Sequence, residues 1–184
     1  MKSIYPKESK AILFLLTNEE KLAEEILSEF ERHLGPVEMR SDWHSFPKSH
    51  YYEEEMGPNL KRRLIGFKNI FEPHRLVELK QLATTIENQF SHDACRMSHD
   101  VQQRSINIDP GYVDLFKVVL ASGKAGGQKV ALSAEVYSCT LLRFEKGKWI
   151  PFDWSFPDFK EATYHDDLLK IRGNLKRNLL TADG

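Results

Sequence analysis

The sequence predicts an α+β fold, with a ferredoxin-like core that is extended by further antiparallel strands and a C-terminal helix. The first half of the chain reads strand, helix, strand, strand, helix, strand, which is the order of the split β-α-β unit. No helical pattern separates its second and third strands, and this argues against a doubly wound parallel sheet. The second half contains four further strand patterns and one closing helix.

The first strand and the first helix have clear sequence signals. Residues 11–16 form a short, continuously apolar run, as in a buried strand. Asn18 is predicted to cap the following helix, and the acids Glu19 and Glu20 suit its positive N-terminal end. Apolar residues then recur at helical spacing until the Gly-Pro pair at 35–36 ends the helix.

The rest of the first half supplies three strands and a second helix. Residues 37–46 and 63–71 are predicted strands, and an amphipathic helix follows between residues 73 and 90. The fourth strand, at 103–109, alternates polar and apolar side chains. We expect this strand to end at Asp109, because the Pro and Gly that follow favour a type II turn.

The second half is predicted to be an antiparallel extension. Strands are predicted over residues 115–122, 130–135, 136–145 and 149–154. Gly147 supplies the left-handed position of a hairpin turn, and a closing helix over 164–180 is weakened by Gly173. A length of 184 residues suits one domain over 1–184, with the split unit at about 8–111 and the extension at about 112–184.

The composition of the chain argues against several classes of function. A net charge of −1 gives no electrostatic case for nucleic acid or for an anionic membrane. The longest apolar run is far shorter than the roughly 20 residues that cross a bilayer. Cys95 and Cys139 are too few and too far apart for a disulfide framework, so a reducing, cytoplasmic location is expected. Whether these two cysteines meet is left open.

Charged and amide groups gather where the fourth strand is predicted to stop, and Lys117 and Lys124 follow soon after. A lysine near a carboxylate can bind a phosphate or carboxylate ligand as a point charge. The Walker pattern is absent, which disfavours a phosphate loop around Lys124. The candidate catalytic groups are Asp109, Glu135 and Lys117. The candidate ligand-binding groups are Arg104, Asn107, Tyr112, Lys124, Glu53 and Glu55.

Several of these residues also have plainer structural interpretations. Asp109 is more often a turn former than a catalyst. The acids at 53–55 are typical of a solvated loop, with a flap of acid/base or metal-binding carboxylates as the sharper alternative. Oxygen ligands from Asp109, Glu135 and Glu53 or Glu55 could hold a metal, but no spacing identifies a metal or a cofactor. Paired Cys/His spacing of a closed zinc site is absent.

The aromatic run at 149–159 is interpreted as a lid that packs against the sheet. The alternatives are a binding surface for a flat ligand and an interface. Asp153 and Asp158 are predicted to be polar groups at its rim.

Five blocks of residues resemble, in order, those of one family. They are residues 52–57, 107–112, 117–122, 134–135 and 154–158. On these blocks the chain is similar to an uncharacterised prokaryotic family known only as a domain of unknown function. The resemblance implies a small, soluble, single-domain protein and transfers no activity. The chain departs from the family pattern at 128–130, which lacks the usual histidine, and at Phe156 and Phe159, where tyrosines are usual.

The leading functional hypothesis is a small-ligand-binding protein or enzyme for an anionic or phosphorylated metabolite. Arg104, Lys117 and Lys124 would supply positive charge. Asp109 and Glu135 would supply acid/base or metal-binding carboxylates. The alternative is a non-catalytic interaction or oligomerisation module, including a homo-oligomer, because ferredoxin-like sheets have edges that pair readily. Nucleic-acid binding ranks third.

Overall fold

The computed structural model describes residues 8–46, 50–92 and 103–182. The elements in chain order are β1 (Ser9–Thr17), α1 (Glu20–Leu34), β2 (Val37–Arg40), β3 (His44–Ser45), α2 (His50–Met56), β4 (Lys61–Phe71), η1 (Pro73–Arg75), α3 (Leu76–Gln89), β5 (Ser91–His92), β6 (Gln103–Arg104), β7 (Ile106–Val113), β8 (Lys117–Ser122), β9 (Val130–Ala131), β10 (Tyr137–Glu145), β11 (Lys148–Pro151), α4 (Pro157–Lys160) and α5 (His165–Ala182). No described helix is both long and apolar enough to cross a bilayer.

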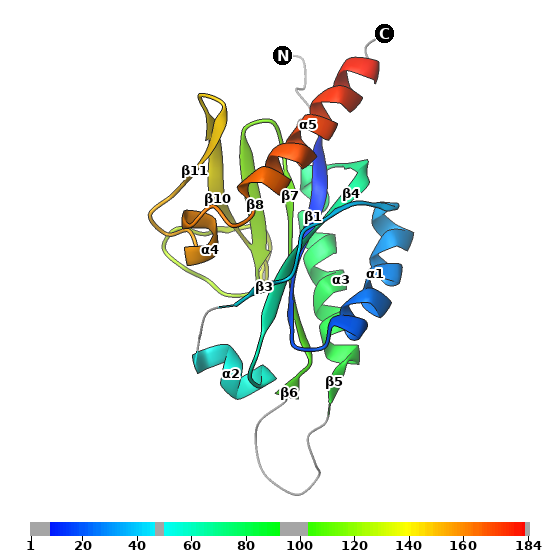
Figure 1. The fold of residues 1–184 in the computed structure, drawn as a ribbon, viewed down its shortest axis with the longest axis vertical. Coiled ribbons are helices and arrows are strands. Elements are labelled where there is room, and N and C mark those ends of the chain that lie inside the picture. The colour runs from blue at the N-terminus through cyan, green and yellow to red at the C-terminus, as the bar shows by residue number, and fades with distance from the viewer. Residues whose placement is uncertain (1–7, 47–49, 93–102, 183–184) are drawn as a thin grey trace, which may run out of the picture.

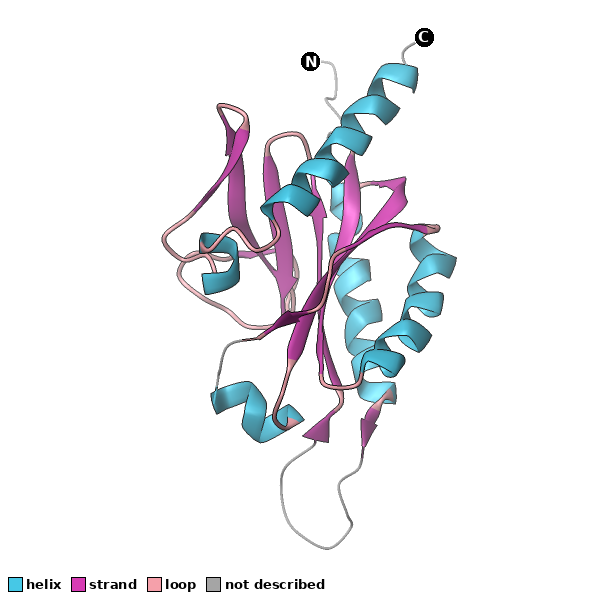
Figure 2. Cartoon of the chain, in the orientation of Figure 1, coloured by secondary structure: helices cyan, strands magenta, loops and turns pink. Residues whose placement is uncertain are grey.

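A nine-stranded antiparallel sheet forms the centre of the molecule, with helices on both of its faces (Figures 1 and 2). The strand order is β11-β10-β8-β7-β1-β4-β2, with β3 paired to β4 and β9 paired to β10. The predicted α+β class is therefore confirmed. The sheet runs through both predicted parts of the chain, and the division into two parts stays a prediction.

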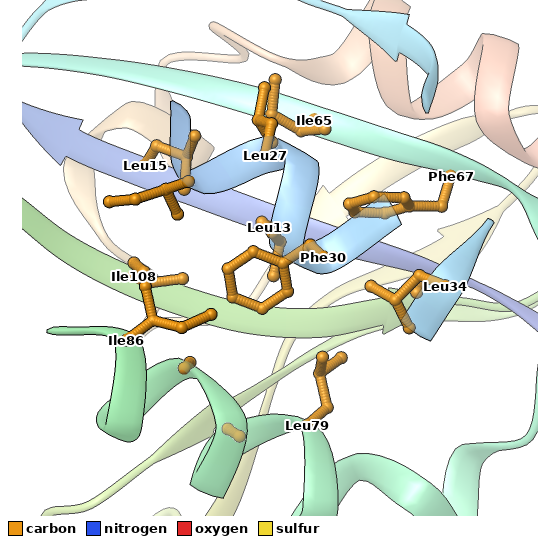
Figure 3. Close-up of a cluster of buried hydrophobic side chains, with 14 of the residues drawn as sticks. Leu13, Leu15, Leu27, Phe30, Leu34, Ile65, Phe67, Leu79, Ile86 and Ile108 are labelled. Atoms are coloured by element: carbon orange, nitrogen blue, oxygen red, sulfur yellow. The ribbon is translucent and has the colours of Figure 1, made fainter. Parts of the chain in front are cut away.

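Two apolar cores cover the two faces of the sheet, and β1 is therefore buried along its whole length. The odd-numbered residues Leu13 and Leu15 pack against α1 and α3, in the cluster shown in Figure 3. The even-numbered residues Ile12 and Phe14 pack on the other face, where α5 crosses the sheet. This alternation is the side-chain period of a strand.

Most predicted elements are confirmed, with shifts at their ends. The hairpin turn before β11 has positive φ at both Lys146 (50°) and Gly147 (84°), as a type I′ turn requires. α5 continues through Gly173 without a break. The cap predicted at Asn18 is wrong: its amide donates to the Met56 carbonyl, and the Thr17 hydroxyl accepts from the Glu19 N–H instead.

Three predicted strands are wrong over part of their length. The strand predicted at 103–109 is divided at Ser105 into β6, which pairs with β5 in a separate two-stranded sheet, and β7. The strand predicted at 37–46 is broken into β2 and β3, because the hydroxyl of Ser41, and not a backbone carbonyl, accepts from the Leu64 N–H. The strand predicted at 130–135 is confined to β9. After β9 the N–H groups of Leu132 and Ser133 both donate to the Val136 carbonyl, which closes a tight turn.

Candidate functional site

The turn predicted at Asp109 is wrong, because β7 continues through the Asp-Pro-Gly sequence to Val113. All of β7 pairs with β1, and Gly111 does not have a positive φ. A Cβ added at Gly111 would lie 2.2 Å from the Val119 carbonyl oxygen of β8. Gly111 is therefore explained by the close approach of two strands and not by turn chemistry.

β7 and β8 separate on the N-terminal side of Gly111, which is the first residue of β7 that pairs with β8. Asp114 donates its N–H to the Lys117 carbonyl, so by the alternation of an antiparallel ladder the even-numbered residues of β7 present their backbone groups toward β8. Pro110 is the next such residue on the N-terminal side of Gly111. It has no N–H, so it leaves no unbonded backbone donor where the strands separate.

Side chains of α3 take the place of the absent strand at Ile108, the next residue of this series. Its N–H donates to the Glu87 carboxylate at 2.6 Å, and its carbonyl accepts from the Lys80 ammonium at 3.4 Å. The carboxylate and the ammonium are 3.8 Å apart and both side chains are largely buried. Burial raises the pKa of Glu87, and the nearby Lys80 charge opposes that shift.

A cavity of about 410 Å³ lies in the gap between the two strands. Because the gap passes through the sheet, the lining comes from both faces. Lys80 and Thr84 belong to α3, on the α1/α3 face, whereas Leu120 and Cys139 belong to the core on the α5 face. The remaining lining residues are Tyr52, Arg104, Asn107, Asp109, Ala121, Ser122, Gly123, Lys124, Gln128, Lys129, Leu141, Trp154 and Phe156.

The charge of the cavity wall is predominantly positive. Its cationic residues are Lys80, Arg104, Lys124 and Lys129, and Asp109 is its carboxylate. Asp109 is already compensated, because it accepts from the buried Arg62 at 2.9 Å.

Arg104 and Asn107 form a fixed pair in the wall. The Arg104 guanidinium donates to Glu55 at 2.7 Å and to Asn107 Oδ1 at 3.2 Å. Burial acts to lower the pKa of Arg104, but its bond to Glu55 and the charge of Glu55 raise it overall. Because Oδ1 is the acceptor, the orientation of the Asn107 amide is set. Its buried Nδ2 has no hydrogen-bond partner among the described residues.

Lys129 is held by neutral oxygen atoms. Its ammonium donates to the Ser122 hydroxyl at 2.8 Å and to the Lys124 carbonyl at 2.9 Å. Within the described part of the chain, Lys129 forms no ion pair. Its charge is therefore not balanced by a carboxylate, unlike those of Lys80 and Arg104.

The outer part of the cavity is apolar. Trp154 and Phe156 are 44% and 48% exposed, and the Trp154 indole is held by a hydrogen bond to the Thr140 carbonyl at 2.8 Å. Burial raises the pKa of the Cys139 thiol, and the charge of Lys129 opposes this shift. Among the residues described, no three His, Cys, Asp or Glu side chains come together as a metal site would require.

The comparison with family models gives one match. The model described as Domain of unknown function (DUF4416) matches residues 7–174. The chain belongs to this family. The match extends from β1 into α5, and the resemblance of the sequence blocks to a family without an assigned function is confirmed. The comparison with curated proteins and the comparison with solved structures each return no match.

The DUF4416 fold brings together several residues that the sequence singled out. Arg104, Asn107, Asp109 and Lys124 line the same cavity, although the turn that was expected to gather them does not exist. Glu55 is the partner of Arg104. Glu135 lines a second, adjacent cavity of about 600 Å³.

Other candidates lie elsewhere in the DUF4416 chain. Lys117 is at the opposite end of β8 from the cavity and pairs with Asp114. Tyr112 is part of the α1/α3 core, and burial, with the charge of Asp114, raises its pKa to about 12. The side chain of Glu53 and the whole of Cys95 lie outside the described residues, so their predicted roles and the pairing of the cysteines stay predictions.

One part of the aromatic run of the DUF4416 chain packs as a lid, and another part borders the cavity. Trp149 and Phe159 are buried in the core on the α5 face, as a packed lid predicts, whereas Trp154 and Phe156 border the cavity. Asp158 is not a rim group: it is buried and accepts from Arg62 at 2.7 Å.

Sequence reasoning did not find Arg62, Lys80, Lys129 and Cys139. Lys80 lies in a helix with other charged residues, and Lys129 lies in a loop that contains several glycines, so no local pattern distinguishes either lysine. Arg62 lies one residue before the predicted third strand. Extension of that strand by alternation from buried Leu64 would have placed it on an inward face.

Proposed function

We propose that this protein binds a small anionic ligand, with phosphorylated metabolites as the preferred class, in the cavity between β7 and β8. One observation carries the proposal: the cavity wall contains four cationic side chains, and the charge of Lys129 has no carboxylate partner among the described residues. An anionic ligand would supply the missing negative charge.

The size and lining of the cavity support a small molecule. Its volume of about 410 Å³ falls in the usual range of roughly 300 to 1,000 Å³ for ligand pockets, which are largely apolar with a few polar groups that fix the ligand. Asn107 Nδ2 is such a group. A buried donor without a partner destabilises the protein, and a hydrogen bond to an acceptor atom of the ligand would remove that cost.

Phosphate is favoured because the donors are of two complementary kinds. Arg104 presents a planar guanidinium, already oriented by Glu55, whereas lysines act as compact point charges. A phosphate group accepts from both kinds of donor at once. Asp109 would be the group in the wall able to accept a proton if the bound ligand reacts.

The experiment that tests the proposal is a thermal-shift screen with inorganic phosphate, pyrophosphate, sugar phosphates, nucleotides and dicarboxylates. A ligand that binds only the native state raises the melting temperature. We expect Lys129→Gln to abolish the shift and Lys117→Gln to preserve it, because Lys117 lies at the opposite end of β8 from the cavity.

A second readout uses Cys139, which lines the same cavity. In a Cys95→Ser background, a bound anion should slow the alkylation of Cys139 by iodoacetamide. The proposal is overturned if no anion in the screen raises the melting temperature, or if Lys129→Gln and Lys117→Gln respond alike.

An interaction or oligomerisation module is the second candidate function, and one observation favours it. Trp154 and Phe156 are large, about half exposed and close in sequence, as in the core of a weak protein interface. Light scattering tests this candidate. A dimer that dissociates on the double substitution Trp154→Ala and Phe156→Ala supports it, and a strict monomer at high concentration removes it.

We also propose that the first part of the chain is a ferredoxin-like unit. The strand order β7-β1-β4-β2 and the position of α1 and α3 on one face support this topology. An experimental structure in which either crossover helix lies on the opposite face would contradict it.

A further inference from the structure

A second cavity lies next to the first and shares lining residues with it. It has a volume of about 600 Å³ and lies between α3 and the segment that leads from β8 to β10. Lys80, Thr84 and Gly123 line both cavities. A ligand bound at the cationic wall of the first cavity therefore has room to extend past Lys80 into the second.

The two cavities differ in chemistry. Gln81, Thr84 and Thr85 of α3 give the second cavity a wall of uncharged hydrogen-bonding groups. Glu135 and Tyr137 add a carboxylate and a phenol from the loop before β10 and from its first residue. The cationic residue of the second cavity is Lys80, which also lines the first. The positive charge is therefore concentrated in the first cavity.

We propose that the two cavities form one elongated site for a phosphorylated sugar or polyol. The phosphate lies in the first cavity, near Lys129 and Arg104, and the hydroxyl groups lie in the second. This inference rests on the proposed function, because the phosphate is the group that the cationic wall holds.

The residues of the second cavity fit hydroxyl groups in particular. A carboxylate accepts from hydroxyl groups and holds them firmly through charge-assisted hydrogen bonds, which is the role open to Glu135. A threonine hydroxyl both donates and accepts, which suits a ligand whose hydroxyl groups do the same. A second acidic group in this cavity would instead meet the charge of Glu135.

The test is isothermal titration calorimetry with inorganic phosphate and with glycerol 3-phosphate, ribose 5-phosphate and glucose 6-phosphate. At least one of the three organic phosphates should bind about tenfold more tightly than inorganic phosphate, the gain expected from one or two further hydrogen bonds. Tyr137→Phe and Glu135→Gln, at residues that line the second cavity and not the first, should reduce that gain and leave the affinity for inorganic phosphate unchanged. Glu161→Gln, an exposed acid away from both cavities, is the matched control.

The outcomes separate the two proposals. If the organic phosphates bind no more tightly than inorganic phosphate, or if Tyr137→Phe and Glu135→Gln change nothing, the sugar phosphate inference is wrong and the anion site remains. If neither inorganic phosphate nor any organic phosphate binds, both proposals are wrong. Unfolding curves of each variant, compared with the parent protein, show whether a lost affinity comes from a lost fold.

Discussion

The carboxylate of Glu87 accepts the backbone N–H of Ile108 at 2.6 Å, at the point where β7 has separated from β8. In this way a helix side chain stabilises a strand edge that would otherwise face a cavity with an unsatisfied donor. Because this N–H is already bonded, it is not available to a further strand at this position.

Substitution of Glu87 should show how much this contact contributes. We expect Glu87→Leu to lower the free energy of unfolding by about 1 to 3 kcal/mol, the cost of leaving a buried donor unsatisfied. Glu87→Gln keeps an acceptor oxygen of the same reach and should cost clearly less. Urea unfolding of both variants measures the difference, and equal losses would show that the hydrogen bond to Ile108 is not the cause.

Gly111 should not tolerate a side chain. A Cβ at this position would meet the Val119 carbonyl at 2.2 Å and the Leu120 side chain at 2.4 Å. We expect Gly111→Ala to destabilise the fold by about 1 to 3 kcal/mol through overpacking. Gly127→Ala is the control, because nothing lies within 4 Å of the added atom. Thermal unfolding of the two variants would contradict the interpretation if both lost the same stability.

Arg62 is a buried cation with two carboxylate partners, Asp109 and Asp158. Removal of one partner from a buried ion pair typically costs about 3 to 5 kcal/mol, so Arg62→Met should destabilise strongly. Arg32→Met, which removes an exposed pair with Glu29, should cost about 0 to 1 kcal/mol. Denaturant unfolding with a small loss for Arg62→Met would show that the two carboxylates are compensated by other groups.

The raised pKa of Tyr112 predicts that the protein loses stability at alkaline pH. Its pKa is raised from 10.0 to about 12 by burial and by Asp114, so the folded state keeps a proton that the unfolded chain releases. Stability from this group is complete below pH 10 and is lost as the pH rises from 10 to about 12. The loss amounts to about 2 to 3 kcal/mol.

Tyr112→Phe cannot ionise, so its stability should fall less steeply over this pH range. Chemical unfolding at pH 8, 10 and 11.5 measures the slopes of the two proteins. Identical slopes would mean that the Tyr112 hydroxyl ionises at its ordinary pKa in the folded protein.

The elements that sequence reasoning found are those whose signal is local. The apolar run of β1 and the two positive-φ positions of the hairpin at Lys146 and Gly147 are set by a few neighbouring residues. The Asp-Pro-Gly sequence has an equally clear local signal for a turn, and that signal was wrong. Pairing with β1 along the whole of β7 outweighs it, and the missing N–H of Pro110 falls where β8 departs.

The candidate site was found in part for a similar reason. Arg104, Asn107 and Asp109 were singled out together because they lie close in sequence. They belong to two consecutive strands, β6 and β7, and all three line one cavity. Lys80 and Lys129 reach that cavity from α3 and from a loop. No spacing along the chain connects them to β7, so a single sequence could not show that they belong to the same wall.

The ion pairs of Arg62 join parts of the chain that are made at different times. Asp109 lies 47 residues after Arg62, and Asp158 lies 96 residues after it. During synthesis, Arg62 and Asp109 are therefore made before Asp158 of α4, the second carboxylate that pairs with Arg62. The cavity wall can reach its final arrangement only after Asp158 has left the ribosome, and the proposed ligand should bind only after that point.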